Sequence, residues 1–322
     1  MDTKQQLLEL LLRHKGEYVS GQQIGTQLSV SRAAIWKAIT ALRAEGYQID
    51  AVKNKGYCLS TQTDVISAVG VRKYLQPEYQ GLDITVHPTL VSTNNTAREN
   101  AACGASEGVV FALTQTGGKG RKGRSFFSPQ GSGIYMSLLL RPHHFSAEKA
   151  ASLTTMAAVA VCEAIESVCG KTAKIKWVND VFVDGKKACG ILTEAAMGIE
   201  TGTLDYAIVG IGINVTPPRE GFPDELKSIA GAILLSPQSD GKNRLATEVI
   251  NRFMYYYLSK NQGYVSSYRS KSFILGRQIT VIGFDSERTA TALDIDGECR
   301  LIVRYDSGET AALSSGEISI KI

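Results

Sequence analysis

The chain has 322 residues, more than one ordinary domain requires, so we expect two or three domains. Its apolar fraction of 43% is sufficient for buried cores, and a net charge of +4 neither requires nor excludes a nucleic-acid partner. The N-terminus lacks the layout of a signal peptide, and the long apolar run at residues 153–165 is too short and too interrupted by threonine to span a bilayer. We therefore expect a cytoplasmic protein.

The six cysteines stand at positions 58, 103, 162, 169, 189 and 299, with no CxxC spacing and no histidine at ligand spacing. This pattern favours buried reduced thiols over a zinc site or a disulfide framework. His143 and His144 follow Pro142 in an expected turn, where a metal role is not favoured. The sequence therefore predicts no metal site built from protein ligands.

Three short helices are expected first, at residues 3–14, 21–28 and 32–45. Ser20 and Ser31 precede the second and third of them and can cap them. Two alternating segments follow, at residues 47–52 and 56–59, with the basic tip Lys53-Asn54-Lys55 between them. This order is typical of a winged helix-turn-helix.

The third helix has an inward face of Ile35, Ile39 and Leu42, and an outward face with Arg32, Lys37, Arg43 and no acid before Glu45. A basic face suits phosphates better than a hydrophobic partner, so DNA binding is favoured over a protein-binding module. Trp36 is either half-core or a base contact. The residues predicted to contact DNA are Ser31, Arg32, Ala33, Trp36, Lys37, Lys53 and Lys55.

A polar linker is expected at residues 60–64, with Asp64 capping a helix at residues 65–75. Beyond it, strand-like runs alternate with long helical runs and no GxGxxG opens a helix after the first strand, which predicts an α+β domain on a mixed or antiparallel sheet. Strands are expected near residues 84–86, 109–114, 134–140, 174–178, 188–195 and 206–215, and helices near 94–102, 146–168 and 245–258.

Two polar constellations precede the middle of this domain. Ser92-Thr93-Asn94 lies at a strand-to-helix junction, where it can bind a polar ligand or simply cap the helix. Residues 117–124, here called the glycine-rich loop, hold four glycines and four cations without an acid. Glycines allow close approach of the backbone, and the cations suit phosphates and a carboxylate, so we expect a mobile phosphate-binding loop. Phe126 follows it and can stack on a purine.

Two further constellations lie on strands. Lys176-Trp177-Val178-Asn179-Asp180 stands at a strand end, before an Asp184-Gly185 turn that predicts a hairpin. Lys187 opens the returning strand, beside Gly190. The segment from Gly210 to Val215 is an apolar strand with two glycines. Because glycine weakens a strand, its presence here indicates a place where a ligand or another part of the backbone comes close to the strand.

Together these motifs resemble the biotin–protein ligases, and with the winged helix the whole chain resembles the bifunctional form that is also the biotin operon repressor. The departures are Lys119 where the family often has Arg, Phe126 where it often has Trp, and Val178 where it often has Pro. The motifs that carry the resemblance, in chain order, are residues 92–94, 118–124, 176–180, 187–194 and 210–214.

The resemblance implies two half-reactions. The biotin carboxylate first attacks the α-phosphate of ATP, giving biotinoyl-5'-AMP and pyrophosphate, and a lysine of a biotin carboxyl carrier domain then takes the biotinoyl group. The implied cofactors are ATP and Mg²⁺ held mainly through phosphates, and the implied partners are the carrier protein of acetyl-CoA carboxylase or a related enzyme, operator DNA, and a second copy of the chain in a ligand-promoted homodimer.

Site residues follow from the same resemblance. Lys187 and Arg121 are the implied catalytic residues. Biotin is expected near Ser92, Thr93, Asn94, Gln115, Lys119, Gly120, Arg121 and Lys187, and ATP near Arg124, Phe126, Lys176, Asn179, Asp180 and Asn214.

Short strands near residues 279–281, 289–292, 299–303 and 310–313 predict a small C-terminal barrel, SH3-like by the resemblance, which ends in residues 315–320. Its expected role is to close over the nucleotide or to dock the acceptor. We therefore expect domains at residues 1–62, 63–270 and 271–322. The rival functions are a repressor that binds biotin without ligating it, and a lipoate ligase.

Overall fold

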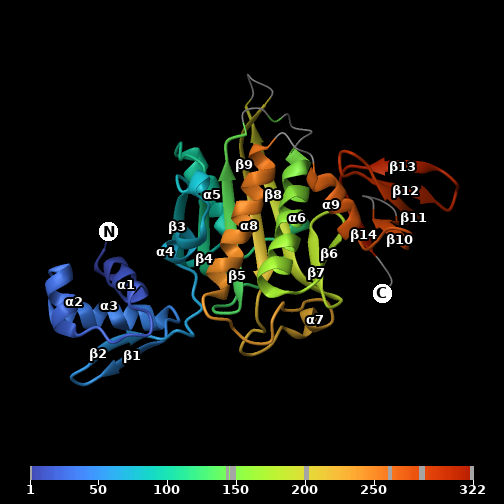
Figure 1. Cartoon of the computed structure of the whole chain (residues 1–322). Coiled ribbons are helices and arrows are strands. Elements are labelled where there is room, and N and C mark those ends of the chain that lie inside the picture. The colour runs from blue at the N-terminus through green and yellow to red at the C-terminus, as the bar shows by residue number, and fades with distance from the viewer. Residues whose placement is uncertain are drawn as a thin grey trace.

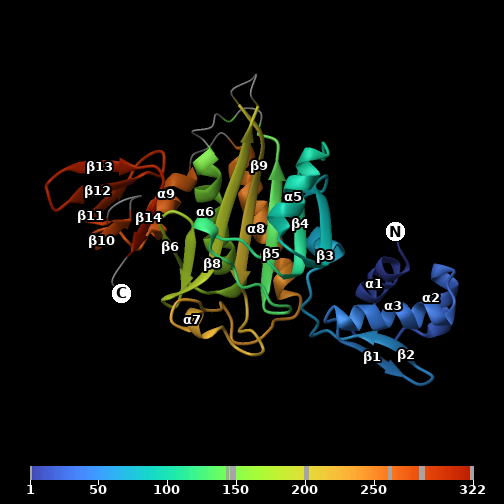
Figure 2. The ribbon, with the colours of Figure 1, turned by 180° about the vertical axis from the view of Figure 1, so that it is seen from behind.

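The computed structural model describes residues 2–142, 145, 150–198, 203–259, 263–282 and 287–319. The chain forms a winged helix, a central domain with a seven-stranded sheet, and a small five-stranded domain. The first and the last lie at opposite ends of the central domain (Figures 1 and 2). The interpretations placed on His143, His144, the helix start at residue 146 and residue 320 lie outside the described residues.

The winged helix matches its prediction closely. Ser20 closes a capping box with Gln23, and the Ser31 hydroxyl accepts the backbone N–H of Ala34, so each serine stabilises the start of its helix. The helices are α1 (Thr3–Arg13), α2 (Gly21–Leu28) and α3 (Arg32–Ala44), and the wing strands are β1 (Ile49–Val52) and β2 (Gly56–Leu59).

Helix α3 divides its faces as predicted, with Ile35, Ile39 and Leu42 fully buried. Trp36 is 65% exposed, so the half-core interpretation of this residue is wrong. Arg43 is also not a free cation, because its guanidinium donates two hydrogen bonds to the carbonyl oxygen of Ile49, at 2.9 and 2.6 Å. It therefore ties α3 to the wing.

The prediction that Asp64 caps the next helix is wrong. Helix α4 (Ala68–Tyr74) is capped by Ser67, whose hydroxyl accepts the N–H of Gly70. Asp64 is buried and accepts the backbone N–H of Lys242 at 2.7 Å, in the first turn of α8 (Gly241–Leu258). Burial raises the pKa of Asp64, opposed by the nearby Lys242 ammonium. The linker thus packs onto the central domain.

The central sheet has the strand order β3-β4-β5-β9-β8-β7-β6, with β3 and β4 parallel and the other neighbours antiparallel. The predicted mixed sheet is confirmed, and the Asp184-Gly185 turn joins β7 to β8 with both residues at positive φ. The strands are β3 (Asp83–Leu90), β4 (Gly108–Gln115), β5 (Gly133–Leu140), β6 (Ala173–Lys176), β7 (Asp180–Val183), β8 (Lys186–Met197) and β9 (Leu204–Asn214).

The two faces of this sheet are covered differently. Helices α6 (Ala150–Cys169) and α8 pack on one face, over alternate residues such as Phe111, Met136 and Val209. Helix α5 (Thr93–Ala102) lies on the other face, over Val110, Leu139 and Ile208 (Figure 2). The remaining helices, none of which was predicted, are η1 (Pro77–Tyr79), η2 (Arg121–Gly123), α7 (Asp224–Lys227) and α9 (Gly263–Lys271).

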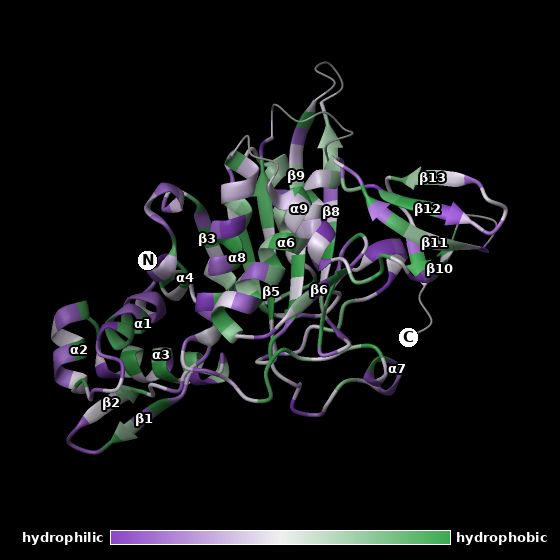
Figure 3. Cartoon of the chain, turned by 45° about the vertical axis from the view of Figure 1, so that its right-hand side comes forward, coloured by the Kyte–Doolittle hydropathy of each residue, from purple (hydrophilic) through white to green (hydrophobic). Residues whose placement is uncertain are grey.

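Helix α6 corrects the expectation that no apolar segment is long enough for a membrane. It has 20 residues and is apolar enough to cross a bilayer by length and composition alone. Most of its apolar window is nevertheless buried inside the fold. Figure 3 shows hydrophobic residues concentrated on α6 and on the strands it covers, which is the pattern of a core helix.

The C-terminal domain is an antiparallel sheet with the order β13-β12-β11-β10-β14, as predicted for an SH3-like fold. It is attached to the central domain through Trp177, whose indole N–H donates to the carbonyl of Cys299 at 3.1 Å. Its strands are β10 (Gln278–Ile282), β11 (Glu287–Ile295), β12 (Leu301–Tyr305), β13 (Thr310–Leu313) and β14 (Glu317–Ser319).

Replacing Asp64 by alanine leaves the Lys242 ammonium, whose side chain is 5% exposed, without its carboxylate partner. We expect the free energy of unfolding to fall by about 3 kcal/mol, because a buried ion pair broken from one side is strongly destabilising. Urea unfolding measures the change. Glu78→Ala, which removes an exposed carboxylate, is the control, and equal stability of the two variants would contradict the role of the pair.

Candidate active site

A pocket of about 440 Å³ opens on the face of the sheet that carries α5. Its walls come from the start of α5, the glycine-rich loop, strands β8 and β9, the turn between β6 and β7, and β14 of the C-terminal domain. Segments that are far apart in the sequence therefore meet around one cavity.

Glycines create the space for this pocket. Gly190 on β8 and Gly212 on β9 are paired across the sheet, and a Cβ atom on Gly212 would lie 2.5 Å from the ring of Phe126. A Cβ atom on Gly210 would lie 2.2 Å from the side-chain oxygen of Asn94. Side chains from the loop and from α5 thus occupy room that larger strand residues would fill, which accounts for the glycines noted in β9.

The start of α5 forms a buried polar group. Ser92 stands at the N-cap position without a side-chain capping bond, so helix capping alone does not explain it. Gln115 accepts hydrogen bonds at its side-chain oxygen from the Thr93 N–H at 2.8 Å and from the Thr93 hydroxyl at 3.2 Å. Its amide nitrogen donates to Ser128 at 2.9 Å. Thr93 and Gln115 are therefore held in position in the wall of the pocket, next to Ser92.

The glycine-rich loop is folded back on itself. The N–H of Gly120 donates to the carbonyl of Arg124 at 2.7 Å, and the N–H of Phe126 donates to the carbonyl of Gly118 at 2.8 Å. Arg121 donates to the side-chain oxygen of Asn179 at 3.0 Å, which draws the loop onto the β6–β7 turn. The mobility of this loop stays a prediction.

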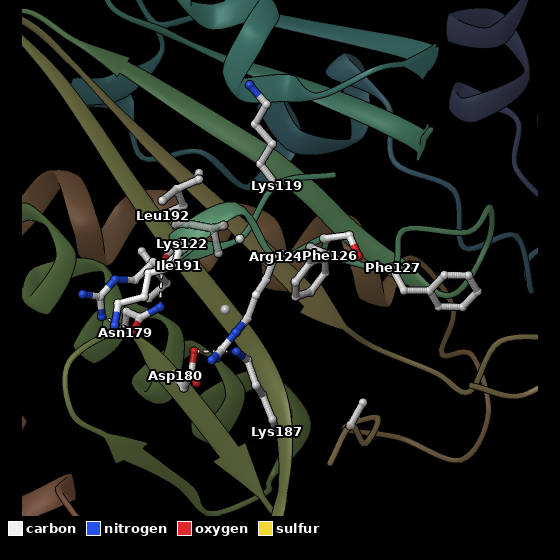
Figure 4. A pocket seen from close by; sticks show the side chains of 18 of the residues that line it. Lys119, Lys122, Arg124, Phe126, Phe127, Asn179, Asp180, Lys187, Ile191 and Leu192 are labelled. Atoms are coloured by element: carbon white, nitrogen blue, oxygen red, sulfur yellow. Dashed lines mark hydrogen bonds and ion pairs between the residues drawn. The ribbon is translucent and has the colours of Figure 1, made fainter. Parts of the chain in front are cut away.

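Two lysines and one aspartate lie opposite the loop. Lys187 Nζ is 2.7 Å from Asp180 Oδ1, and Figure 4 shows the two side chains pointing toward each other across the pocket. Burial lowers the pKa of Lys176, against the opposing charge of Asp180. This end of the pocket thus carries two lysine side chains, of which Lys187 is paired with Asp180.

The C-terminal domain contributes Glu317, which sequence reasoning did not place in the site. Its carboxylate forms ion pairs with Arg124 and, at 3.3 Å, with Lys122 of the glycine-rich loop. Partial burial opposes ionisation of Glu317, but its bonds to Arg124 and Lys122 hold its pKa below the ordinary value. Arg124 and Glu317 are 193 residues apart in the sequence, so no local sequence pattern predicts their contact.

Comparison with known proteins agrees with this geometry. Residues 3–58 match a model of an HTH domain, residues 86–214 the Biotin/lipoate A/B protein ligase family, and residues 274–321 the Biotin protein ligase C terminal domain. The Bifunctional ligase/repressor BirA of Bacillus subtilis (strain 168) is 36% identical over 95% of this chain and 95% of that protein. The chain belongs to the family of bifunctional biotin ligase/repressors.

More distant relatives of the ligase/repressor family agree. The Bifunctional ligase/repressor BirA of Escherichia coli (strain K12) is 28% identical over 97% of this chain and 96% of that protein. A solved biotin protein ligase from Aquifex aeolicus, in complex with biotin and ATP, superposes with a TM-score of 0.61 over 74% of this chain and 98% of that one. At 24% identity, this second likeness shows the shared fold.

The biotin and ATP residues expected of a family member all line this one pocket, from Ser92 to Asn214. Lys119 is turned toward α5, where its ammonium donates to Asn95 at 2.8 Å, and Figure 4 shows it pointing away from Lys187. The ligand that each residue binds stays a prediction. Lining residues that lie outside the motifs taken from the sequence are Ser125, Met136, Phe222, Leu226, Ile229 and Ala230.

The residues predicted to meet DNA are all exposed on the winged helix. A second cavity, of about 400 Å³, lies between α2, Arg32 and the wing residues Lys53 and Lys55. Ser31 also serves as the cap of α3, so it has a structural role in addition to any contact with DNA. The wing tip is hydrophilic in Figure 3, as a phosphate-facing segment requires.

Proposed function

We propose that this chain is an ATP-dependent biotin–protein ligase that also acts as a biotin-responsive DNA-binding repressor. The observation that carries this proposal is the division of the pocket into two ends. At one end, the hydroxyl and amide groups of residues 92–94 and Gln115 suit a polar ring, and at the other end the cations suit a carboxylate and phosphates. A cytoplasmic location, where ATP is available, is part of the proposal.

In the first half-reaction, an oxygen of the biotin carboxylate attacks the α-phosphorus of ATP, and pyrophosphate leaves. Lys187 lines the cationic end of the pocket, where its ammonium offsets the negative charge that grows on the α-phosphoryl oxygens. Arg121 and Arg124 bind phosphates, and Phe126 stacks on adenine. Asn179 and Asp180 order the nucleotide, whose Mg²⁺ is held mainly by the phosphates.

In the second half-reaction, the ε-amine of a carrier lysine attacks the acyl carbon of biotinoyl-5'-AMP. The new amide bond forms as the bond to phosphate breaks, and AMP leaves. No covalent intermediate with the protein is required. The test incubates the chain with ATP and biotin, measures pyrophosphate, and then adds a biotin carboxyl carrier domain. Pyrophosphate without biotinylated carrier would instead identify a protein that activates biotin but no longer ligates it.

For Lys187→Ala we expect a loss of at least about 100-fold in pyrophosphate release, since removing one group that stabilises transition-state charge has effects of this size. The thermal unfolding midpoint should be nearly unchanged. Lys171→Ala is a matched control, because Lys171 also pairs with an aspartate, Asp184 at 3.0 Å, but on the surface. Normal pyrophosphate release by Lys187→Ala would remove Lys187 from the mechanism.

The DNA-binding proposal rests on the exposed cations of α3 and the wing. For Lys53→Ala/Lys55→Ala we expect weaker binding to a duplex of about 40 base pairs, and a salt dependence of log K lower by about 2, because each phosphate contact contributes about 0.9 to the slope. Fluorescence anisotropy at several salt concentrations measures both. Lys174→Ala, an exposed lysine of the central domain, is the control, and a slope equal to the control's would refute the wing contacts.

We further propose that biotinoyl-5'-AMP orders the glycine-rich loop and favours a homodimer, which brings two winged helices to two operator half-sites. Sedimentation velocity should show a larger species with biotin and ATP than without them. Lys187→Ala, which is expected not to form the adenylate, should stay at its ligand-free mass under the same conditions. An unchanged mass of the wild-type chain would count against ligand-promoted dimerisation.

A further inference from the structure

Helix α5 and strand β8 are joined beside the pocket by a carboxylate that the proposed mechanism does not use. Glu194 on β8 accepts a hydrogen bond from the side-chain amide of Asn94 at 2.7 Å. Its other oxygen accepts from the guanidinium of Arg98, one turn further along α5. A carboxylate that holds a guanidinium has no proton to donate, so it can only accept from Asn94.

This contact orients the Asn94 amide. Both acceptors of the Asn94 nitrogen, Glu194 and the carbonyl oxygen of Leu192 at 3.4 Å, lack a proton to give. The Asn94 side-chain oxygen must therefore face the opposite way, toward Ser137 of β5. Ser137 is fully buried, and its hydroxyl lies 2.6 Å from the Asn94 oxygen and 2.7 Å from the Thr93 hydroxyl oxygen.

The three residues Thr93, Asn94 and Ser137, here called the pocket floor, are short of one proton. Ser137 donates toward two oxygens but has a single hydroxyl hydrogen, and the Thr93 hydrogen is directed at Gln115. While the Thr93 hydrogen is on Gln115, Ser137 can donate to only one of the two oxygens, and the other keeps an open acceptor site. Thr93 and Asn94 line the pocket and Ser137 lies behind them, so the missing donor can come from a ligand.

We propose that Glu194, held by Arg98, is a positioning residue that keeps the pocket floor proton-poor and so makes the pocket select an acid whose ring carries N–H groups. The inference rests on the proposed ligase function and adds its substrate selectivity. The matched family model covers biotin and lipoate ligases. Both acids carry a pentanoate chain, but the cyclic urea of biotin has two N–H groups and the dithiolane of lipoate has none.

The expected discrimination is large. A site built to bond a substrate N–H rejects an analogue without it by about 10⁴-fold or more, because its buried acceptors are left unpaired. The carboxylate of Glu194 maintains this arrangement only while it cannot donate. A glutamine in its place offers an NH₂ group to the Asn94 oxygen, which lets the Asn94 amide turn over and present its own NH₂ to Ser137 and Thr93.

The test compares Glu194→Gln with the wild-type chain. We expect the KM for biotin to rise by about 10- to 100-fold, while kcat at saturating biotin and the KM for ATP stay within about twofold. The reason is that the lost interaction stabilises bound biotin equally in the ground state and in the transition state. The dissociation constant of lipoate should not rise, because lipoate has no N–H to lose and leaves fewer buried acceptors unpaired in the variant. The ratio of biotin to lipoate affinity should therefore fall by at least the same factor.

Glu163→Gln is the matched control, since Glu163 also accepts from an arginine, Arg252 at 2.9 Å, but on the opposite face of the sheet. It should leave both affinities unchanged. Arg98→Gln removes the guanidinium that holds Glu194 and keeps the carboxylate, so it should weaken biotin binding by a smaller factor. It replaces Glu194→Gln in the test if that variant does not fold. An unchanged biotin affinity, or equal losses for both acids, overturns the inference.

Titration calorimetry of both acids in the absence of ATP keeps this test separate from the proposed function. If the wild-type chain releases no pyrophosphate yet binds biotin in preference to lipoate, and Glu194→Gln reduces that preference by the expected factor, the ligase proposal fails and the selectivity stands. If pyrophosphate is released but Glu194→Gln keeps the wild-type preference, the selectivity inference fails alone.

Discussion

The pocket depends on three glycines, which leave one face of two adjacent strands without side chains. Gly190, Gly210 and Gly212 leave β8 and β9 without bulk on the α5 face, while the opposite face of the same strands is packed under α6 and α8. The sheet stays a rigid support because its helical side is a continuous core. Its open side receives Asn94 and the ring of Phe126, and a single methyl group at Gly210 or Gly212 would collide with one of them.

Three of the cations around this support each have a partner from a different element. Lys187 pairs with Asp180 across the β7–β8 hairpin, Arg121 bonds Asn179, and Arg124 reaches Glu317 in the C-terminal domain. A polyanionic ligand has to compete with these protein partners. The C-terminal domain therefore takes part in the electrostatics of the pocket, and its contribution depends on one carboxylate.

Local patterns predicted the parts of the fold that local physics decides. Ser20 and Ser31 stabilise helix starts by accepting backbone N–H groups three residues later, so a single sequence reveals them. Asp64 has the same appearance, but its oxygen bonds a residue 178 positions later. Glu317 and Glu194 were missed as partners for the same reason, since their bonds to Arg124 and Asn94 depend on how strands are brought together.

The seam between the winged helix and the central domain has a consequence for truncated forms of the chain. Gln130, which follows the glycine-rich loop, donates to the carbonyl of Ala44 at 3.1 Å, and Lys242 donates to the carbonyl oxygens of Gly131 and Asp64. A ligase fragment that starts after Asp64 would expose the first turn of α8 and leave the buried Lys242 ammonium without its carboxylate. A fragment that keeps Thr63 and Asp64 would retain the carboxylate that accepts the Lys242 N–H. The winged helix should therefore be separable from the ligase domain only if the cut is made before these two residues.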